Sequence, residues 1–512
     1  MPADTPHVLG ASERGEPGGP PSLGEPGLGG LLQLAGRRRP RAVVLIDGEH
    51  YPPVVRAALT RLAQHYELIA ALFVGGREKL RDGCAAADLG DIYGLPVRLA
   101  LPFDADDAAA VFGPGGVAGE LAALLDASSA DTVVDLSDEP VLGYRERFLL
   151  ISAALAAGVR YVGADFEFAP PTRARLVSKP ALAIVGTGKR VGKTAVSGYA
   201  ARLLDELYRE RGGVVVLAMG RGGPPEPEVV DGRGLAAADL LALSRRGRHA
   251  ASDCYEDALL AGVTTIGCRR CGGGMAGASY DDNVAAALSL LERQPAALAL
   301  LEGSGSVIPP VSAQGTICVA SAAQPLEYVA GFLGTYRLLI SDILVVTMCE
   351  APFASGKQVA RIVAAAKSVN PDLTVVPVVM RPRPTAPLTG RKVALFTTAS
   401  KRGLATISEH LQREYCAEVV VASADLADRD ALAAAVKRAA RRAEVFVTEI
   451  KAAAIDVVAE AAAASGRELV FFDNEPVPVA CGGLSAGDLA AAVGALAKKC
   501  QTRFAEALRR SE

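Results

Sequence analysis

The stretch that decides the fold is Gly186-Thr187-Gly188-Lys189-Arg190-Val191-Gly192-Lys193-Thr194. It follows a short apolar run, residues 181–185, and precedes apolar residues at the i, i+3, i+4 spacing of a helix. A buried strand, a glycine-bounded loop, Gly-Lys-Thr and a helix are the layout of a P-loop. Backbone N–H groups of such a loop wrap phosphates, and the helix N-terminus adds partial positive charge. The stretch predicts a nucleoside triphosphate site. The alternative is a glycine-rich turn that carries a surface lysine.

Within this loop, Lys193 is expected to reach the β- and γ-phosphates, and the Thr194 hydroxyl to ligate Mg²⁺. Lys189 and Arg190 add two cations where the γ-phosphate would react. Thr187 departs from the common pattern, which has glycine at that position.

Composition limits the function classes. The 512 residues are long enough for two to four domains, and no uninterrupted apolar run reaches 18 residues, so we expect no membrane span. A formal net charge of −3 argues against general nucleic-acid binding. Nine cysteines over this length and a start without a secretory h-region predict a cytoplasmic protein with reduced thiols.

Along the chain, strand-like and helical stretches alternate, which predicts parallel α/β sheets. We expect a P-loop NTPase core flanked by an N-terminal Rossmann-like α/β domain and a smaller C-terminal α/β unit. The expected boundaries are a disordered Gly/Pro-rich tail (1–40), the N-terminal domain (41–178), the P-loop domain (179–385), the C-terminal unit (386–497) and a C-terminal tail (498–512). Residues 381–387, rich in Arg and Pro, are expected to form a linker.

Two acidic turns follow predicted strands of the N-terminal domain, at residues 47–50 and 135–139. Ligands of parallel sheets lie beyond the carboxyl ends of strands. These turns could bind a metal ion or a sugar hydroxyl, or they could be helix caps and solvated turns. We assign them no role.

In the P-loop domain, Glu302 ends a predicted buried strand and is followed by Gly303-Ser304-Gly305. An acid at this position typically holds Mg²⁺ or its water opposite the loop lysine. Together with Thr194 it is the predicted metal site, the alternative being a surface turn acid.

Arginines beside glycines suggest a second, anionic ligand. A planar guanidinium binds phosphate through two hydrogen bonds, and glycine lets backbone amides approach. One such group alone would more often be a solvated face, but several follow strands of the P-loop edge. The candidates are Arg221, Arg245, Arg246, Arg248, Arg269, Arg270 and the neighbouring His249.

Cys268-x-x-Cys271 invites a zinc or redox interpretation. Zinc takes four ligands, and no second CxxC or His pair accompanies this one. We therefore expect these thiols to be packing residues.

Several long strings together resemble one family, the cyclic 2,3-diphosphoglycerate synthetases. The strings are residues 46–55, 186–194, 218–224, 249–253, 264–277, 302–305 and 448–454. The likeness extends over about residues 42–480. It implies that ATP drives closure of the two phosphates of 2,3-diphosphoglycerate into an intramolecular anhydride, with ADP and phosphate as the other products.

The combined prediction is an ATP- and Mg²⁺-dependent synthetase in which Lys193, Lys189 and Glu302 act on the γ-phosphate and the arginines hold the small anionic substrate. A related ligase or kinase acting on another phosphorylated or carboxylated acid is the first alternative. A regulatory P-loop ATPase is the second, and Lys189 lies out of register for its signature lysine. We expect no nucleic-acid or membrane partner, and a homodimer remains open.

Overall fold

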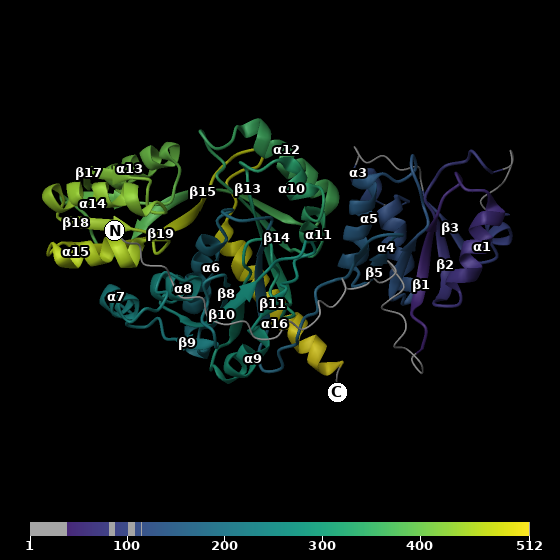
Figure 1. The fold of residues 1–512 in the computed structure, drawn as a ribbon, viewed down its shortest axis with the longest axis horizontal. Coiled ribbons are helices and arrows are strands. Elements are labelled where there is room, and N and C mark those ends of the chain that lie inside the picture. The colour runs from purple at the N-terminus through teal and green to yellow at the C-terminus, as the bar shows by residue number, and fades with distance from the viewer. Residues whose placement is uncertain (1–37, 81–87, 101–107, 114, 511–512) are drawn as a thin grey trace, which may run out of the picture.

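The computed structural model describes residues 38–80, 88–100, 108–113 and 115–510 (Figure 1). Nearly all of the expected N-terminal tail therefore lies outside the described residues. Of the helices that the structure describes, none has the length and apolar character that a membrane span needs.

The N-terminal domain is a six-stranded sheet in the order β3-β2-β1-β4-β5-β6, parallel except for the β5–β6 pair. This is the Rossmann-like order expected of two half-units that diverge at a switch point between β1 and β4. Its elements are β1 (Arg41–Ile46), α1 (Pro52–Leu62), β2 (Glu67–Phe73), α2 (Leu89–Tyr93), β3 (Val97–Leu99), α3 (Ala108–Phe112), α4 (Val117–Ser128), β4 (Thr132–Asp135), α5 (Tyr144–Ala156), β5 (Arg160–Val162) and β6 (Glu167–Phe168).

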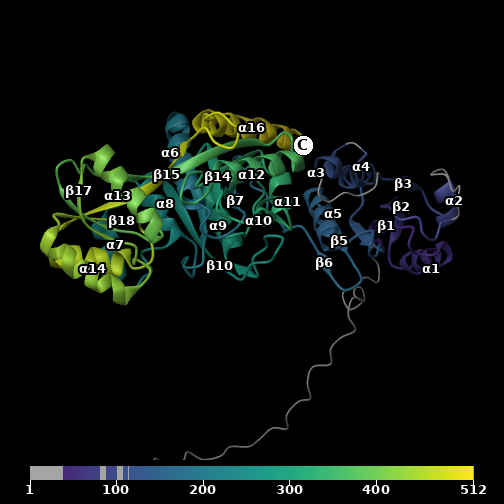
Figure 2. The ribbon, with the colours of Figure 1, turned by 90° about the horizontal axis from the view of Figure 1, so that it is seen from above.

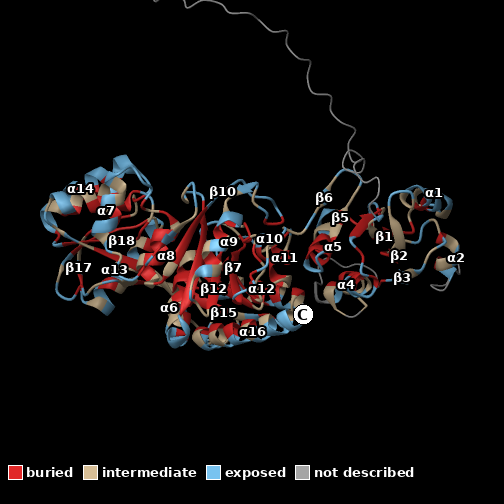
Figure 3. Cartoon of the chain, turned by 90° about the horizontal axis from the view of Figure 1, so that it is seen from below, coloured by how far each residue is buried: buried red, intermediate tan, exposed pale blue. Residues whose placement is uncertain are grey.

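The P-loop domain begins with β7 (Ala181–Gly186), whose neighbours β12 and β13 both run parallel to it. Its central strands, among them β7, β8 and β12, are mostly apolar, as is typical of strands covered on both faces, and Figure 3 shows them buried. Further elements are α6 (Lys193–Leu207), a 3₁₀ turn (Arg209–Arg211), β8 (Val214–Gly220), β9 (Glu228–Val230), α7 (Ala237–Arg245), α8 (Asp253–Ala261), β10 (Thr264–Cys271), β11 (Asp281–Asp282), α9 (Val284–Arg293), β12 (Leu298–Glu302), β13 (Gly315–Ser321), α10 (Leu326–Ala330), α11 (Gly334–Leu339), β14 (Ile343–Thr347), α12 (Gly356–Val369) and β15 (Thr374–Pro384).

The C-terminal unit continues the same sheet, whose described strands follow the order β11-β10-β8-β12-β7-β13-β14-β15-β19-β18-β16-β17, with β9 paired to β10 off this path. It contains β16 (Lys392–Phe396), α13 (Lys401–Tyr415), β17 (Glu418–Ser423), α14 (Arg429–Arg442), β18 (Val445–Thr448), a π-helix (Ala454–Ala459), α15 (Glu460–Ala464) and β19 (Glu468–Pro478). The two units join where β15 pairs antiparallel with β19 from Val378↔Pro478 to Pro384↔Phe472.

The expected linker at residues 381–387 is therefore wrong for residues 381–384, which extend strand β15. Thr385 donates its N–H to Phe471 O (2.8 Å) and Val479 N–H donates to Pro377 O (3.0 Å). Along β15, every second residue directs its backbone nitrogen toward β19, and the nitrogens of Pro382 and Pro384 are on the other side. Their missing N–H groups therefore remove no hydrogen bond between the two strands.

The expected C-terminal tail from residue 498 is also wrong as far as Arg509, because α16 runs from Leu489 to Arg509. Asp488 caps it by accepting from Ala491 N–H (2.8 Å), and one apolar stripe, including Val493, Leu496 and Cys500, is buried. Figure 2 shows α16 lying along the P-loop domain, where it contacts α6, β7 and β13. The last helix thus returns to the P-loop domain rather than completing the C-terminal unit.

The N-terminal domain meets the P-loop domain through α5 and α11. The Phe148 and Phe332 rings pack edge to face with centroids 5.5 Å apart, and Ser152 Oγ donates to Phe332 O at 3.3 Å. One buried apolar cluster includes Leu150 of α5 and Tyr336 of α11, so the two domains share core.

Candidate active site

The loop between β7 and α6 has the form that its sequence predicts. Lys193 is the first residue of α6 and is buried, and Gly192 before it has φ = 92°, which favours glycine. A Cβ on Gly186 would lie 2.7 Å from Lys193 Cδ. Glycine is needed there because the lysine side chain folds back over the loop. Lys189 and Arg190 are exposed on the same loop.

Neighbouring strands hold this loop in place. Thr187 Oγ1 donates to Gln324 Oε1 (2.7 Å), and Thr347 Oγ1 at the end of β14 donates to Val191 O (2.8 Å). The threonine that departs from the common pattern thus has a structural partner, and the loop is tied to the segments after β13 and β14.

Lys193 lies between two kinds of charge. Burial lowers the pKa of Lys193; Glu302 and Asp253 raise it, while Arg270 and Arg221 lower it further. Lys193 is therefore within the electrostatic influence of two groups of residues, which we call the carboxylate side and the guanidinium side of the site. A buried cation of this kind provides a strong local field for an incoming phosphate.

The carboxylate side consists of Glu302, at the end of β12, and Asp257 on α8. Burial raises the pKa of both groups, and each lies within hydrogen-bond reach of the other. The Thr194 hydroxyl lowers the pKa of Glu302. Among the described residues, no donor reaches Glu302 Oε2 or either carboxylate oxygen of Asp257. Two adjacent buried carboxyls without donors need a shared proton or a cation.

These oxygens and the Thr194 hydroxyl fit Mg²⁺, which prefers hard oxygen ligands and usually takes only one or two carboxylates in addition to substrate phosphates. The described part of the chain holds no cluster of three His, Cys, Asp or Glu side chains that could bind a metal by itself. A metal here would accordingly depend on phosphate oxygens. Sequence reasoning missed Asp257; the signal available was its i+4 spacing from Asp253 on one helix face.

The guanidinium side consists of Arg221 after β8 and Arg270 on β10. A Cβ on Gly305 would lie 3.2 Å from Nη2 of both arginines, so the two groups converge there. Arg270 is buried, donates to Gly272 O (2.7 Å) and Ser304 O (2.9 Å), and keeps Nε unpartnered. Burial and Arg221 lower the pKa of Arg270. Within the described ranges neither guanidinium has a carboxylate at ion-pair distance, so this side suits an anion.

The other predicted arginines lie elsewhere. Arg245 donates to both carboxylate oxygens of Glu460 (3.0 and 2.9 Å), and Arg248 pairs with Glu228, which also accepts from Tyr255. Arg246 is exposed. Arg269 is exposed while Arg270 is buried, because successive side chains of a strand point to opposite faces.

His249 is exposed but lies at the edge of the candidate site. A Cβ on Gly222 would lie 2.6 Å from His249 Cδ2, which places the ring against the loop that follows Arg221. The structure therefore brings together Lys193, Thr194, Glu302, Arg221 and Arg270, with His249 nearby.

The two acidic turns of the N-terminal domain are internally satisfied. Asp47 accepts from the N–H groups of Glu49 (3.0 Å) and Asp138 (2.7 Å). Asp135 accepts from Arg147 Nε (3.1 Å) and Tyr161 Oη (2.8 Å). Of the two interpretations left open, turn stabilisation is the one that these bonds support.

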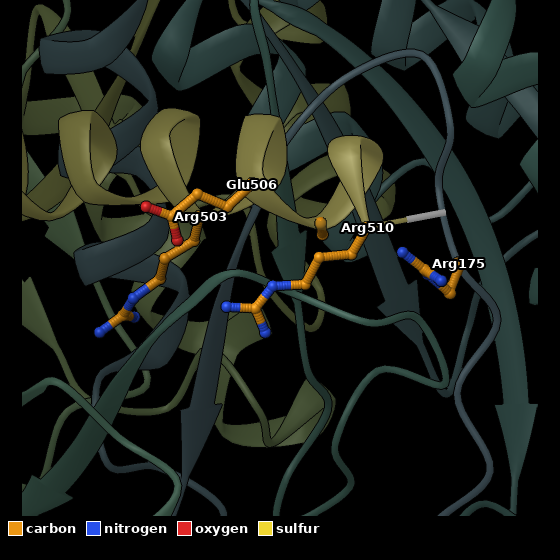
Figure 4. Close-up of a pocket in the computed structure, with 5 residues that line it drawn as sticks. Arg175, Arg503, Glu506 and Arg510 are labelled. Carbon is orange, nitrogen blue, oxygen red and sulfur yellow. The ribbon is translucent and has the colours of Figure 1, made fainter. Parts of the chain in front are cut away.

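A pocket of about 370 Å³ is lined by Arg175, Arg503, Glu506, Ala507 and Arg510 (Figure 4). Arg503 within it pairs with Asp342 (2.9 Å) and donates to Gln314 O (2.7 Å). None of the predicted site residues lines this pocket, so we do not place the chemistry there.

Comparisons with known proteins cover all three units. The N-terminal, P-loop and C-terminal domains of cyclic 2,3-diphosphoglycerate synthetase match residues 41–169, 181–379 and 384–475. Proteins named cyclic 2,3-diphosphoglycerate synthetase are 47% identical over 441 residues (Rubrobacter xylanophilus; 85% of this chain, 94% of that protein) and 42% identical over 439 residues (Methanothermobacter thermautotrophicus; 85% and 92%). Among solved structures, hydrogenase maturation factor HypB from Archaeoglobus fulgidus aligns over 40% of this chain and 82% of that chain at 16% identity, with a TM-score of 0.26, too low to support an argument. The matches over most of the chain show that it belongs to the cyclic 2,3-diphosphoglycerate synthetase family.

Proposed function

We propose that this chain joins the two phosphates of 2,3-diphosphoglycerate into an intramolecular anhydride, at the expense of ATP and with Mg²⁺, releasing ADP and phosphate. The observation that carries the proposal is the division of charge around Lys193. Near this lysine, the carboxylate side has oxygens without donors, and Arg221 and Arg270 have no carboxylate partner among the described residues. One side suits a metal–nucleotide complex and the other a second anion. The names of the relatives support this substrate.

For the nucleotide, the backbone of residues 186–194 and the N-terminus of α6 bind the phosphates, and Lys193 follows the γ-phosphate as charge develops on it. Thr194 and Glu302 would hold Mg²⁺, with Asp257 beside them; the ion would neutralise phosphate charge. Lys189, which is exposed on the loop, would approach the transferred phosphoryl group.

For the acid, Arg221 and Arg270 hold its phosphates against their mutual repulsion. At about 4 Å that repulsion is ~4 kcal/mol per pair of unit charges at an effective dielectric constant near 20. With the two phosphates held together, closure becomes a unimolecular step. The remaining candidates, Arg245, Arg246, Arg248, Arg269 and His249, stay predictions.

The bond changes balance in two steps. An oxygen of one substrate phosphate attacks the γ-phosphorus of ATP, and ADP leaves. The first phosphate now carries the transferred phosphoryl group as a pyrophosphoryl group. An oxygen of the other substrate phosphate then attacks the inner phosphorus of that group, the one nearer the glycerate, which forms the P–O–P bridge and expels inorganic phosphate. Little acid–base catalysis is needed because the attacking oxygens are already ionised.

Phosphorus NMR of the purified protein with ATP, Mg²⁺ and 2,3-diphosphoglycerate tests the proposal. We expect a new anhydride resonance that grows in equal amounts with ADP and phosphate, and none with Lys193→Ala. ADP and phosphate without the anhydride would indicate an ATPase. ADP with a stable phosphorylated acid would indicate the kinase alternative.

A further inference from the structure

Lys451 lies between β18 and the π-helix of the C-terminal unit, and its side chain contacts the P-loop domain. Lys451 Nζ lies 3.3 Å from Oε1 of Glu256 on α8 of the P-loop domain and 3.8 Å from Oε2 of Glu449. Glu256 raises the pKa of Lys451 most strongly, which keeps the ammonium charged. The C-terminal unit thus delivers a cation to a helix of the nucleotide-binding domain.

The backbone around Lys451 is held in an uncommon shape. Ala452 has φ = 48°, a left-handed conformation rare for alanine, and a π-helix begins at Ala454. Glu449 Oε1 accepts from Thr397 Oγ1 and Thr398 Oγ1, both at 2.8 Å, which ties the segment to the end of β16. Strain of this kind persists only where surrounding contacts maintain it.

The target of Lys451 is the acidic face of α8, which we define as Asp253, Glu256 and Asp257. These residues lie at i, i+3 and i+4, so they share one side of the helix, and Glu256 and Asp257 are both buried. Asp253 acts on the charge of Lys193, and Asp257 contacts Glu302. One face of one helix therefore connects the C-terminal unit with the P-loop lysine and its acid.

Charge balance on this face depends on Lys451. Among the described groups that act on the charge of Glu256, Lys451 is the cation, whereas Asp253, Glu449 and Asp473 are acids. Without the lysine, Glu256 and Glu449 face each other with no cation between them. Glu256 is then a buried acid without a cation, and the adjustment that it requires acts on α8 and hence on the two acids beside Lys193 and Glu302.

We propose that Lys451 is a positioning residue of the ATP site, which holds the acidic face of α8 in register with Lys193 and Glu302 through its ion pair with Glu256. This inference rests on the proposed function only in that the P-loop binds ATP. It gives the C-terminal unit a role, which is to set the position of catalytic groups that it does not itself contain.

The test compares Lys451→Met, Lys451→Arg and the double variant Lys451→Met/Glu256→Gln in the full chain. Glu460→Gln is the matched control, because it breaks an exposed ion pair (Arg245, 2.9 Å) between the same two units. Steady-state turnover of ATP with 2,3-diphosphoglycerate is measured together with calorimetric titration of MgADP and thermal unfolding.

We expect Lys451→Met to lower kcat about 10- to 100-fold, as displacement of catalytic groups by about 1 Å does. Lys451→Arg and the double variant should each recover most of the loss, because arginine restores a cation beside Glu256 and glutamine replaces the acid. Glu460→Gln should stay within twofold of wild type. A purely structural role predicts instead a loss that follows the unfolded fraction and that Glu256→Gln does not relieve.

Wild-type kcat in Lys451→Met, or a loss undiminished in the double variant, would overturn the proposal. If 2,3-diphosphoglycerate is not the substrate, the MgADP titration still decides, with weaker binding expected in Lys451→Met and recovery in the double variant. Should Lys451→Met not fold, Lys451→Gln takes its place under the same criteria.

Discussion

Two mostly parallel sheets of this molecule place charged residues beyond the carboxyl ends of their strands, yet they differ in whether these residues have hydrogen-bond partners. In the N-terminal domain, Asp47 and Asp135 accept hydrogen bonds from backbone N–H groups, an arginine and a tyrosine. In the P-loop domain, oxygens of Glu302 and Asp257 have no donor among the described residues. The same residue types at the same edge of the same kind of sheet are satisfied in one case and not in the other.

The difference teaches that unsatisfied charge, rather than charge itself, marks the site. Leaving buried carboxylates and a buried guanidinium without partners costs stability, which a ligand with complementary groups restores. A satisfied carboxylate stabilises its turn and has nothing left to offer a ligand. The comparison gives four predictions, of which the first has the largest expected effect.

Lys193→Ala should lower ATP turnover by about 10²–10³-fold, as loss of one electrostatic group at a transition state typically does. The lysine is the buried cation between the two sides, so its loss removes the field that both ligands share. Steady-state kinetics and circular dichroism measure the effect. Wild-type turnover with a native spectrum would remove the P-loop from the mechanism.

Arg270→Ala and Arg269→Ala should separate two neighbours that the sequence alone treats as a pair. Arg270 is buried beside Arg221, whereas Arg269 is exposed on the opposite face of β10. Loss of the charge-assisted contacts of Arg270 should raise the KM for the diphosphate roughly 10- to 150-fold, with little change in the KM for ATP.

Arg269→Ala is the matched comparison and should raise the KM for the diphosphate far less than Arg270→Ala, because an exposed charge contact contributes little. Arg270→Lys should recover only part of the loss, because an ammonium lacks the planar fork. Equal losses for ATP and the diphosphate in Arg270→Ala would move this arginine to the nucleotide site.

Most of the fold could be predicted because the strands of the P-loop domain are continuous apolar runs bounded by glycine. Strand β13 is an exception that apolar character alone does not predict, since Thr316, Cys318 and Ser321 interrupt it. The extension of β15 could not be predicted either, because Pro382 and Pro384 favour a linker. A strand tolerates them only because their nitrogens point away from β19, which depends on the pairing of the two strands. Tertiary contacts decide both cases.

The candidate site could be predicted in part. Lys193, Thr194 and Glu302 follow from local motifs, because a strand–loop–helix fixes their placement. Which of the arginines remain free of carboxylates could not be predicted from the sequence. Arg245 and Arg248 form ion pairs with residues distant in sequence, Glu460 and Glu228. Such pairing depends on how the units dock.

Asp257→Asn and Asp135→Ala should change the free energy of unfolding in opposite directions. Burial and Glu302 raise the pKa of Asp257, so the ligand-free folded state holds a proton that the unfolded chain has lost, and stability falls as pH rises above about 4. Asparagine removes that cost and should raise the free energy of unfolding at pH 8.

Asp135→Ala should destabilise the protein by about 3 kcal/mol, because it leaves Arg147 and Tyr161 without their buried partner. Urea unfolding at pH 5 and pH 8 measures both changes, and the advantage of Asp257→Asn should shrink at pH 5. Destabilisation by both variants at pH 8 would contradict the contrast between satisfied and unsatisfied carboxylates.

The smallest effect is expected for the two cysteines of the CxxC motif, which flank Arg270 on β10. Cys268 is fully buried, and burial raises the pKa of its thiol to about 12, whereas Cys271 three residues later is exposed. Side chains three apart on a strand point to opposite faces, so the two sulfurs do not converge on one metal ion. Cys271→Ser should therefore change kcat and KM by no more than about twofold, as surface substitutions typically do.

A maleimide should label Cys271 and spare Cys268 in the folded protein, because the thiolate is the reactive form and the buried thiol stays protonated. Metal analysis showing one zinc per chain, lost in Cys271→Ser, would instead place a metal at this edge of the sheet.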